Sequence, residues 1–265
     1  RLPAGKTRAA AADHGIGSVF HRRHLPLQRR SGQIRRSVLS LTAEDVIANG
    51  IGAELRVVVP EPLRLDLPRE ELAFSPGVIP ALYQIVEDLV KPDHGKVLTM
   101  TPDYGFFLHA CEYNGVELVT SPLRKVEEWF EMDWEDFRRK VADPDIRVLM
   151  LCNPHNPTGR IWTEEELRRM AEIIGQNRLW VVSAEIHCDL NRTGLRRIPM
   201  GKVIQDYERL ITCISASKTF NLAGLLHSNI IIRSAQERAR FQTRDKNIGA
   251  VWWTESSSTY SSLLW

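Results

Sequence analysis

The sequence has few cysteines and no long apolar run, and these absences argue against a disulfide-rich, zinc-binding or membrane-spanning protein. Its four cysteines, Cys111, Cys152, Cys188 and Cys213, form no CxxC pair, so neither a zinc site nor a disulfide framework is expected. No apolar stretch approaches the roughly 20 residues that span a bilayer, and the first residues lack the apolar core of about 7–15 residues of a signal peptide. We therefore expect a protein of the reducing cytoplasm, with no metal site and no membrane partner.

Net charge is also nearly absent, at +2, but it is unevenly distributed. Residues 1–36 contain nine Lys and Arg residues and a single acid, Asp13. A basic stretch of this kind is compatible with nucleic-acid binding. It has no interleaved aromatic residues and no DNA-binding motif, however, so a solvated or poorly folded arm is the favoured interpretation. We expect no nucleic-acid partner.

From about residue 67 onward, helical and strand-like patterns alternate. Helices are predicted over 78–90 and 104–115, and Thr163 with Glu166 forms a capping box ahead of a further helix. Short apolar runs predict the strands between them, which cover 96–100, 116–123, 147–153, 179–186, 209–217 and 229–234. This alternation predicts an α/β fold, a mainly parallel sheet flanked by helices on both faces. Ligands in such sheets bind at the carboxyl ends of the strands.

Three predicted strand or helix ends carry unusual residues. "NPHNPTGR" (153–160) follows a buried strand; it is either an ordinary turn or a rigid loop that presents asparagine amides to a crevice. "SASKTFNLAG" (215–224) places Lys218 after another buried strand. An isolated lysine is usually a solvated charge, but a lysine desolvated at the sheet edge would be nucleophilic. "FSPGV" (74–78) begins a helix, where free N–H groups can hold a phosphate.

Together these motifs resemble a known family. "SPGVIPAL", "TPDYGFF", "LCNPHNPTGRIWTEEEL", "EIHCDL" and "SASKTFNLAGL" are similar to the large domain of fold-type I pyridoxal-phosphate enzymes. Within the class I/II aminotransferase superfamily, the sequence most resembles the cystathionine β-lyase-like C–S lyase branch. The resemblance covers roughly residues 67–240. It implies a cofactor-binding large domain at 67–244, between an atypical basic segment (1–66) and an atypical tail (245–265), with the C-terminal small domain largely missing.

The resemblance also implies roles for individual residues. Lys218 would carry pyridoxal 5'-phosphate as a Schiff base and move the α-proton, and Tyr104 would stack on the pyridine ring. Asn156 would donate a hydrogen bond to the ring's phenolic oxygen, with His187 near the same edge. The candidates for binding the phosphate are Gly77, Val78, Ser215 and, less directly, Ser217.

The reaction implied by the resemblance is an α,β-elimination. A cystathionine- or cysteine-type amino acid would be split into pyruvate, ammonia and a thiol. An aminotransferase of the same superfamily is the alternative enzyme, and a non-catalytic cofactor-binding homologue is the alternative outside enzymes. Relatives form dimers, so the resemblance implies a homodimer.

One position departs from the family pattern. Ala184 stands where family members have an aspartate, whose carboxylate pairs with the pyridine nitrogen and keeps it protonated. If strand alternation continues, Glu185 and His187 face away from Ala184 and cannot easily replace that carboxylate. Three explanations stay open. The chain is a natural variant that uses another group, a slow cofactor-binding protein, or a copy altered by reading-frame slips at both ends.

Overall fold

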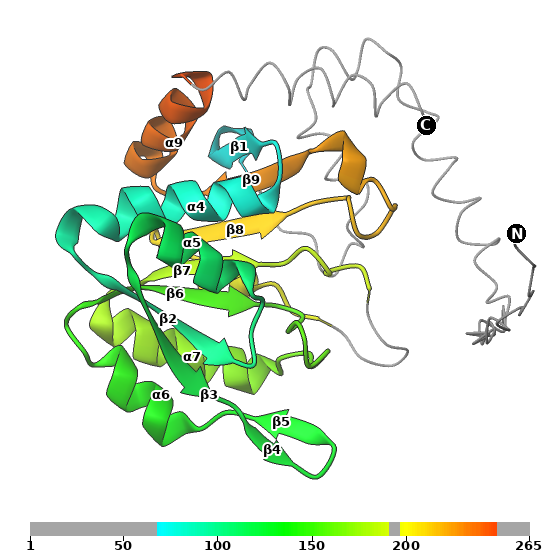
Figure 1. The fold of residues 1–265 in the computed structure, drawn as a ribbon. Helices are drawn as coiled ribbons and strands as arrows, with labels where there is room; N and C mark the ends of the chain where they lie inside the picture. The colour runs from blue at the N-terminus through cyan, green and yellow to red at the C-terminus, as the bar shows by residue number, and fades with distance from the viewer. Residues whose placement is uncertain (1–67, 191–196, 248–265) are drawn as a thin grey trace, which may run out of the picture.

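A seven-stranded sheet organises the part of the chain that this computed structural model describes, residues 68–190 and 197–247. The strand order is β1-β9-β8-β7-β6-β2-β3 (Figure 1). β9 runs antiparallel to both of its neighbours, whereas the other neighbouring pairs are parallel, so the predicted mainly parallel sheet is confirmed. The strands are β1 (Leu72–Ser75), β2 (Lys96–Thr101), β3 (Glu117–Pro122), β6 (Ile146–Cys152), β7 (Trp180–Ala184), β8 (Leu210–Ile214) and β9 (Ser228–Ile232).

Helices cover both faces of the sheet, as predicted (Figure 1). One face carries α4 (Val78–Leu89), α5 (Phe106–Asn114) and α9 (Ala235–Asn247), and the other carries α6 (Trp134–Val141), α7 (Glu164–Asn177) and α8 (Met200–Val203). The smaller elements are the hairpin strands β4 (Arg124–Val126) and β5 (Trp129–Glu131) and the 3-10 turns η2 (Arg69–Glu71), η3 (Lys91–Asp93) and η4 (Ala223–Leu225).

The sequence signals for helix ends act as expected. The backbone N–H of Glu166 donates to Thr163 Oγ1 at 3.2 Å, and the N–H of Thr163 donates back to Glu166 Oε2 at 3.0 Å. This capping box satisfies amides that the first turn of α7 leaves unpaired. α5 ends at Gly115, whose φ of 65° is easily adopted by glycine.

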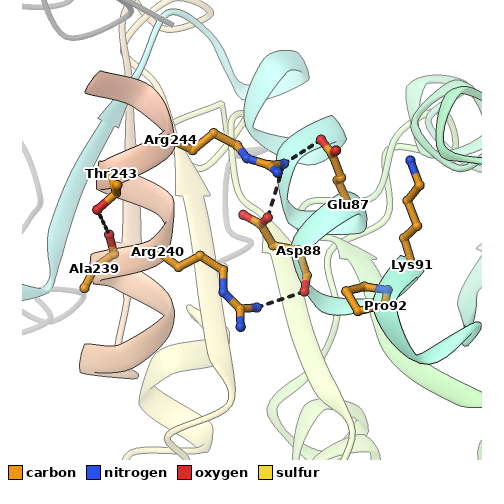
Figure 2. A pocket seen from close by; sticks show the side chains of 8 residues that line it. All are labelled: Glu87, Asp88, Lys91, Pro92, Ala239, Arg240, Thr243 and Arg244. Atoms are coloured by element: carbon orange, nitrogen blue, oxygen red, sulfur yellow. Dashed lines mark hydrogen bonds and ion pairs between the residues drawn. The ribbon is translucent and has the colours of Figure 1, made fainter. Parts of the chain in front are cut away.

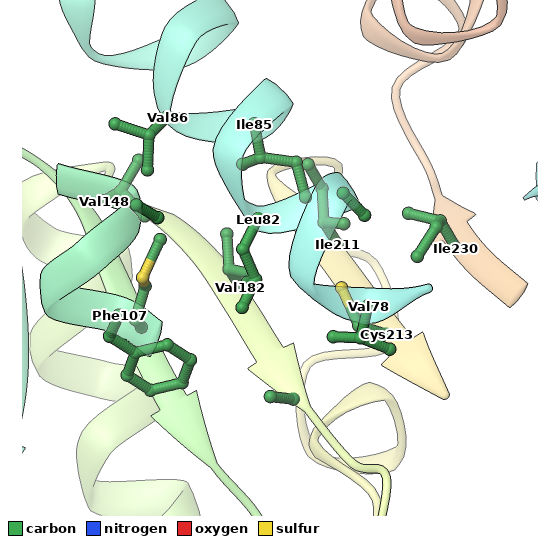
Figure 3. Close-up of a cluster of buried hydrophobic side chains, with 14 of the residues drawn as sticks. Val78, Leu82, Ile85, Val86, Phe107, Val148, Val182, Ile211, Cys213 and Ile230 are labelled. Carbon is green, nitrogen blue, oxygen red and sulfur yellow. The ribbon is translucent and has the colours of Figure 1, made fainter. Parts of the chain in front are cut away.

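Strand β6 separates two apolar cores. Val148 and Met150 point into a cluster with α4 and α5, which Figure 3 shows, while Leu149 and Leu151 point into a cluster with α6 and α7. All four side chains are fully buried. The near-continuous apolar run of this strand therefore reflects burial on both faces.

Some predictions fall outside the described residues. The basic segment 1–66 does so entirely, and only the first three residues of the tail 245–265 are described, as the end of α9. Over the described ranges, no helix is long and apolar enough to cross a bilayer.

Candidate functional site

Three strands end side by side at one edge of the sheet. Cys152, the last residue of β6, pairs with Ala184, the last of β7, and Ala184 pairs with Cys213 of β8. The pairing continues one residue further, because the N–H of Asn153 donates to the Ala184 carbonyl at 3.0 Å and the N–H of Glu185 donates to the Cys213 carbonyl at 2.8 Å. The two motifs that follow β6 and β8 therefore flank the residues that follow β7.

The first turn of α4 lies at the same edge. β1 and β8 both pair antiparallel with β9, through Ser75–Ser228 and Ile214–Asn229, so their carboxyl ends lie on either side of the start of β9. α4 begins at Val78, directly after β1, and no side chain caps its first amides. Gly77 precedes it with a φ of 155°. An uncapped helix start of this kind is a favourable site for an anion.

In the 153–160 loop, the two asparagine side chains do not both present their amides to the surface. The Asn153 side chain is fully buried and donates its amide to the Ile198 carbonyl at 2.9 Å. The expectation that both asparagines face a crevice is therefore wrong for Asn153, because its amide ties the loop to the segment before α8. Asn156 is half-buried, and its backbone N–H bonds to the Cys152 thiol.

Two buried side chains, His155 and Trp162, fix the backbone of this loop. His155 is buried, with its Nδ1 2.8 Å from Thr158 Oγ1, and burial lowers the pKa of its ring to about 4. Trp162 is fully buried and donates from Nε1 to the Cys152 carbonyl at 2.9 Å. The loop thus has a fixed backbone on which Asn156 is presented.

Lys218 lies in a turn beyond β8. The turn is closed by the Phe220 N–H, which donates to the Ala216 carbonyl at 3.0 Å, and it carries the Lys218 side chain into an exposed position. The predicted desolvation of this lysine is wrong, since β8 ends four residues earlier, at Ile214. Its charge reaches His187, where burial first and the Lys218 ammonium second lower the pKa of the imidazole. Lys218 and His187 are therefore near enough for their charges to interact.

The serines beside Lys218 organise the turn. Ser215 is buried; its Oγ donates to the His227 carbonyl at 2.8 Å and accepts the Ser217 N–H at 3.1 Å. Ser217 is half-buried. The Ser215 hydroxyl proton is thus committed within the protein.

Ala184 is enclosed by apolar groups. It is 2% exposed and belongs to the same cluster as Cys152, Cys213 and Ile186, against which Tyr104 packs. Tyr104 is half-buried, and burial followed by the Cys152 thiol raises the pKa of its phenol. The aromatic ring therefore packs against the same apolar cluster that contains the alanine methyl group.

Glu185 faces the other side of the sheet, as strand alternation predicts. Its carboxylate accepts from Ser183 Oγ at 2.8 Å and from the Met200 N–H at 3.0 Å, and it pairs with Arg197. Both charged side chains are buried, at 2% and 7% exposure. Glu185 is therefore part of the structural core.

A second acid at this edge was not anticipated. Asp103 precedes Tyr104, and its Oδ2 is buried with no hydrogen-bond partner among the described residues. Burial raises the pKa of this carboxyl. The sequence signal was an acid inside "TPDYGFF" at a strand end, but sequence alone does not reveal that one oxygen of this half-buried acid has no partner in the described chain.

A surface hollow also lies away from this edge of the sheet. A cleft of about 700 Å³ lies between the end of α4 and α9 (Figure 2). There the Arg244 guanidinium lies 3.2 Å from the Asp88 carboxylate, and the Arg240 guanidinium donates to the Asp88 backbone carbonyl at 3.0 Å. These charges satisfy one another at the opposite edge of the sheet from the motifs. No group of three His, Cys, Asp or Glu residues arranged to hold a metal is found in the described ranges.

The fold and this edge define a class. The family model for class I and II aminotransferases matches residues 59–250, and the chain belongs to that family. Among individual relatives, it is 39% identical over 173 residues to cystathionine beta-lyase PatB of Bacillus subtilis, covering 65% of this chain and 44% of that protein. It is 31% identical over 195 residues to a probable N-succinyldiaminopimelate aminotransferase DapC of Mycobacterium tuberculosis, covering 69% and 49%.

Solved structures give the same result. The PLP-bound C–S lyase from Staphylococcus hominis is 34% identical, with a TM-score of 0.69, over 83% of this chain and 55% of that one. The chain thus spans about half the length of the relatives it matches.

Proposed function

We propose that this chain is the cofactor-binding part of a pyridoxal-phosphate-dependent C–S β-lyase. The substrate class is cystathionine- or cysteine-type amino acids, and the products are pyruvate, ammonia and a thiol. The observation that carries the proposal is the alignment of β6, β7 and β8, which gathers the 153–160 loop, His187 and Lys218 at one edge. Similarity to a cystathionine β-lyase and to a C–S lyase that binds this cofactor supports it.

The residues at the edge fit the cofactor. The uncapped start of α4 suits a phosphate, and the apolar surface around Ala184 and Tyr104 suits a flat ring. The buried, unpaired Oδ2 of Asp103 offers an acceptor for which the described protein supplies no donor. The exposed Lys218 amine is free to condense with an aldehyde. Pyridoxal phosphate, once bound, supplies the electron sink that stabilises a carbanion.

The chain's own groups then have distinct tasks. Lys218 would hold the aldehyde carbon of the cofactor until the amino group of the substrate displaces it, and the freed amine would then take the proton from Cα. Burial and the Lys218 charge favour the neutral form of His187, so this imidazole can accept a hydrogen bond beside the amine. The amides of Gly77 and Val78, with Ser217, are the groups proposed for the phosphate. Ser215 orients the Ser217 backbone through its hydroxyl oxygen.

Two other functions each have one observation in their favour. The match to a DapC aminotransferase favours transamination on the same residues. The methyl group of Ala184 favours a protein that binds the cofactor without turnover, because a methyl group cannot hold a proton on the ring nitrogen. A homodimer and a cytoplasmic location stay predictions.

A titration with pyridoxal phosphate tests the proposal. We expect a Schiff-base absorbance band that Lys218→Ala abolishes and that Lys125→Ala, which removes an exposed lysine on the distant β4, leaves intact. Release of pyruvate from cystathionine then identifies a lyase, whereas transfer of the amino group to a keto acid identifies an aminotransferase. A band that survives in Lys218→Ala as it does in Lys125→Ala would refute the proposed site.

A further inference from the structure

The proposed function leaves the ring nitrogen of the cofactor without a partner at Ala184, and the following inference depends on that function. A bound pyridine nitrogen stays protonated when a carboxylate lies beside it, since the negative charge favours the cationic form. Asp189, five residues beyond β7, is exposed and accepts a hydrogen bond from Thr219 Oγ1 at 2.7 Å, and two other carboxylates of the described chain lie near the end of β7. They are Glu185, the next residue in the sequence, and Asp103, which follows β2.

The Glu185 carboxylate already has partners within the protein. Its carboxylate has hydrogen bonds from Ser183 and from the Met200 backbone, in addition to the buried ion pair with Arg197. It lies on the α7 and α8 face of the sheet, whereas the Ala184 side chain lies on the α4 and α5 face. Turning Glu185 toward Ala184 would leave the Arg197 charge buried and unpaired.

Asp103 is on the correct side. It follows β2, which is separated from β7 by β6 alone, so it lies at the same edge of the sheet as the end of β7, about two strand spacings across. Its charge acts on the thiols of Cys111 and Cys152, and both belong to the cluster that encloses Ala184. Cys152 is also the register partner of Ala184. Asp103 therefore adjoins the cluster into which the alanine methyl group points.

Apart from a hydrogen bond from its own backbone N–H, the Asp103 carboxylate has one oxygen without a partner in the described chain. Oδ2 is buried, and no donor of the described chain reaches it. A buried acceptor without a hydrogen bond costs free energy, which a charged N–H donor would recover. Tyr104, the next residue, is the one proposed to stack on the ring, so the two positions are linked through the backbone.

We propose that Asp103 replaces the carboxylate missing at Ala184 and pairs with the ring nitrogen of the cofactor. The carboxylate is then supplied by the loop after β2 instead of by the end of β7, and it borders the same apolar cluster. Burial raises the pKa of Asp103, and a neighbouring pyridinium would counteract that shift. Ala184 is then a natural variant position with its function supplied from elsewhere in the chain.

The protonation state of the nitrogen tests this directly. The full chain is loaded with pyridoxal phosphate labelled with 15N in the ring, and the nitrogen resonance is recorded at neutral pH. We expect a pyridinium resonance in the unaltered protein and a shift to the neutral-pyridine range in Asp103→Asn, with the Lys218-dependent absorbance band retained. Asp103→Ser repeats the charge removal with a smaller side chain.

A matched control removes a different charge. Glu112→Gln removes a carboxylate that also acts on Cys111, but this side chain is exposed on the outside of α5. It should leave the resonance unchanged. The double variant Asp103→Asn/Ala184→Asp should return the resonance to the pyridinium range, because the carboxylate is then restored on β7.

The outcomes separate the two proposals. A Lys218-dependent band together with the same 15N resonance in Asp103→Asn, Asp103→Ser and the unaltered chain overturns the role of Asp103 and leaves the proposed function standing. A neutral-pyridine resonance in the unaltered chain has the same consequence. Absence of a Lys218-dependent band in the unaltered chain overturns both.

Discussion

The buried pair of Glu185 and Arg197 allows a quantitative prediction. Replacing Arg197 with methionine keeps most of the side-chain volume and removes the charge. Glu185 would stay 2% exposed with two hydrogen bonds, from Ser183 and Met200, but without its counter-ion. Breaking a buried pair on one side costs about 3–5 kcal/mol. The two remaining hydrogen bonds place the expected loss at the lower end, about 3 kcal/mol.

That loss is large on the scale of protein stability. Folded domains are stable by roughly 5–15 kcal/mol, and for a chain of this size about 3 kcal/mol corresponds to a fall in Tm of roughly 6–12 °C. Urea and thermal unfolding followed by circular dichroism would measure both quantities. The double variant Glu185→Gln/Arg197→Met should recover most of the loss, because no unpaired charge is left in the core.

An exposed pair provides the control. Arg168 and Glu164 are one turn apart on α7, with side chains that are 59% and 54% exposed. Arg168→Met should therefore cost less than about 1 kcal/mol. If Arg197→Met costs no more than Arg168→Met, the description of Glu185 as a closed structural residue is wrong, and Glu185 again becomes a candidate partner for the ring nitrogen.

Two further predictions concern the 153–160 loop and α7. Because burial lowers the folded-state pKa of His155 from 6.5 to about 4, the unfolded chain binds the proton first, and this site removes stability as the pH falls from about 6.5 to 4. The expected loss of unfolding free energy over this pH range is about 3 kcal/mol. His155→Gln should therefore flatten the plot of unfolding free energy against pH in this range, and an unchanged slope would contradict the prediction. Thr163→Ala removes one half of the capping box and should lower the unfolding free energy by about 1 kcal/mol in urea titrations. A neutral result would mean that the cap does not contribute to stability.

Much of the fold was accessible from local sequence patterns. The run at 147–153 predicted β6, and the capping box predicted the start of α7, because both signals depend on residues close together in the chain. The alternation of strands and helices also predicted a sheet with its loops at one edge. From this, the approximate position of Lys218 and Asn156 followed.

The exposure of Lys218 could not be read in the same way. The strand pattern continues into the serines, but β8 ends at Ile214 and the turn carries the lysine away from the sheet. Asn153 was similarly misjudged, because its partner, the Ile198 carbonyl, is 45 residues further along the chain. Burial of a polar side chain depends on which distant segment covers it.

The sequence by itself predicted most of the strands and helices between residues 78 and 234 and the departure at Ala184, since periodicity and residue type are properties of the chain. It did not predict β1, the β4–β5 hairpin or α9. Only the tertiary structure decided that Glu185 is held by Arg197 and that Asp103 has a buried oxygen without a partner. The physical reason is that strand order and side-chain burial arise from long-range pairing. No pattern within a single segment specifies which carboxylate at the sheet edge has its hydrogen bonds satisfied and which does not.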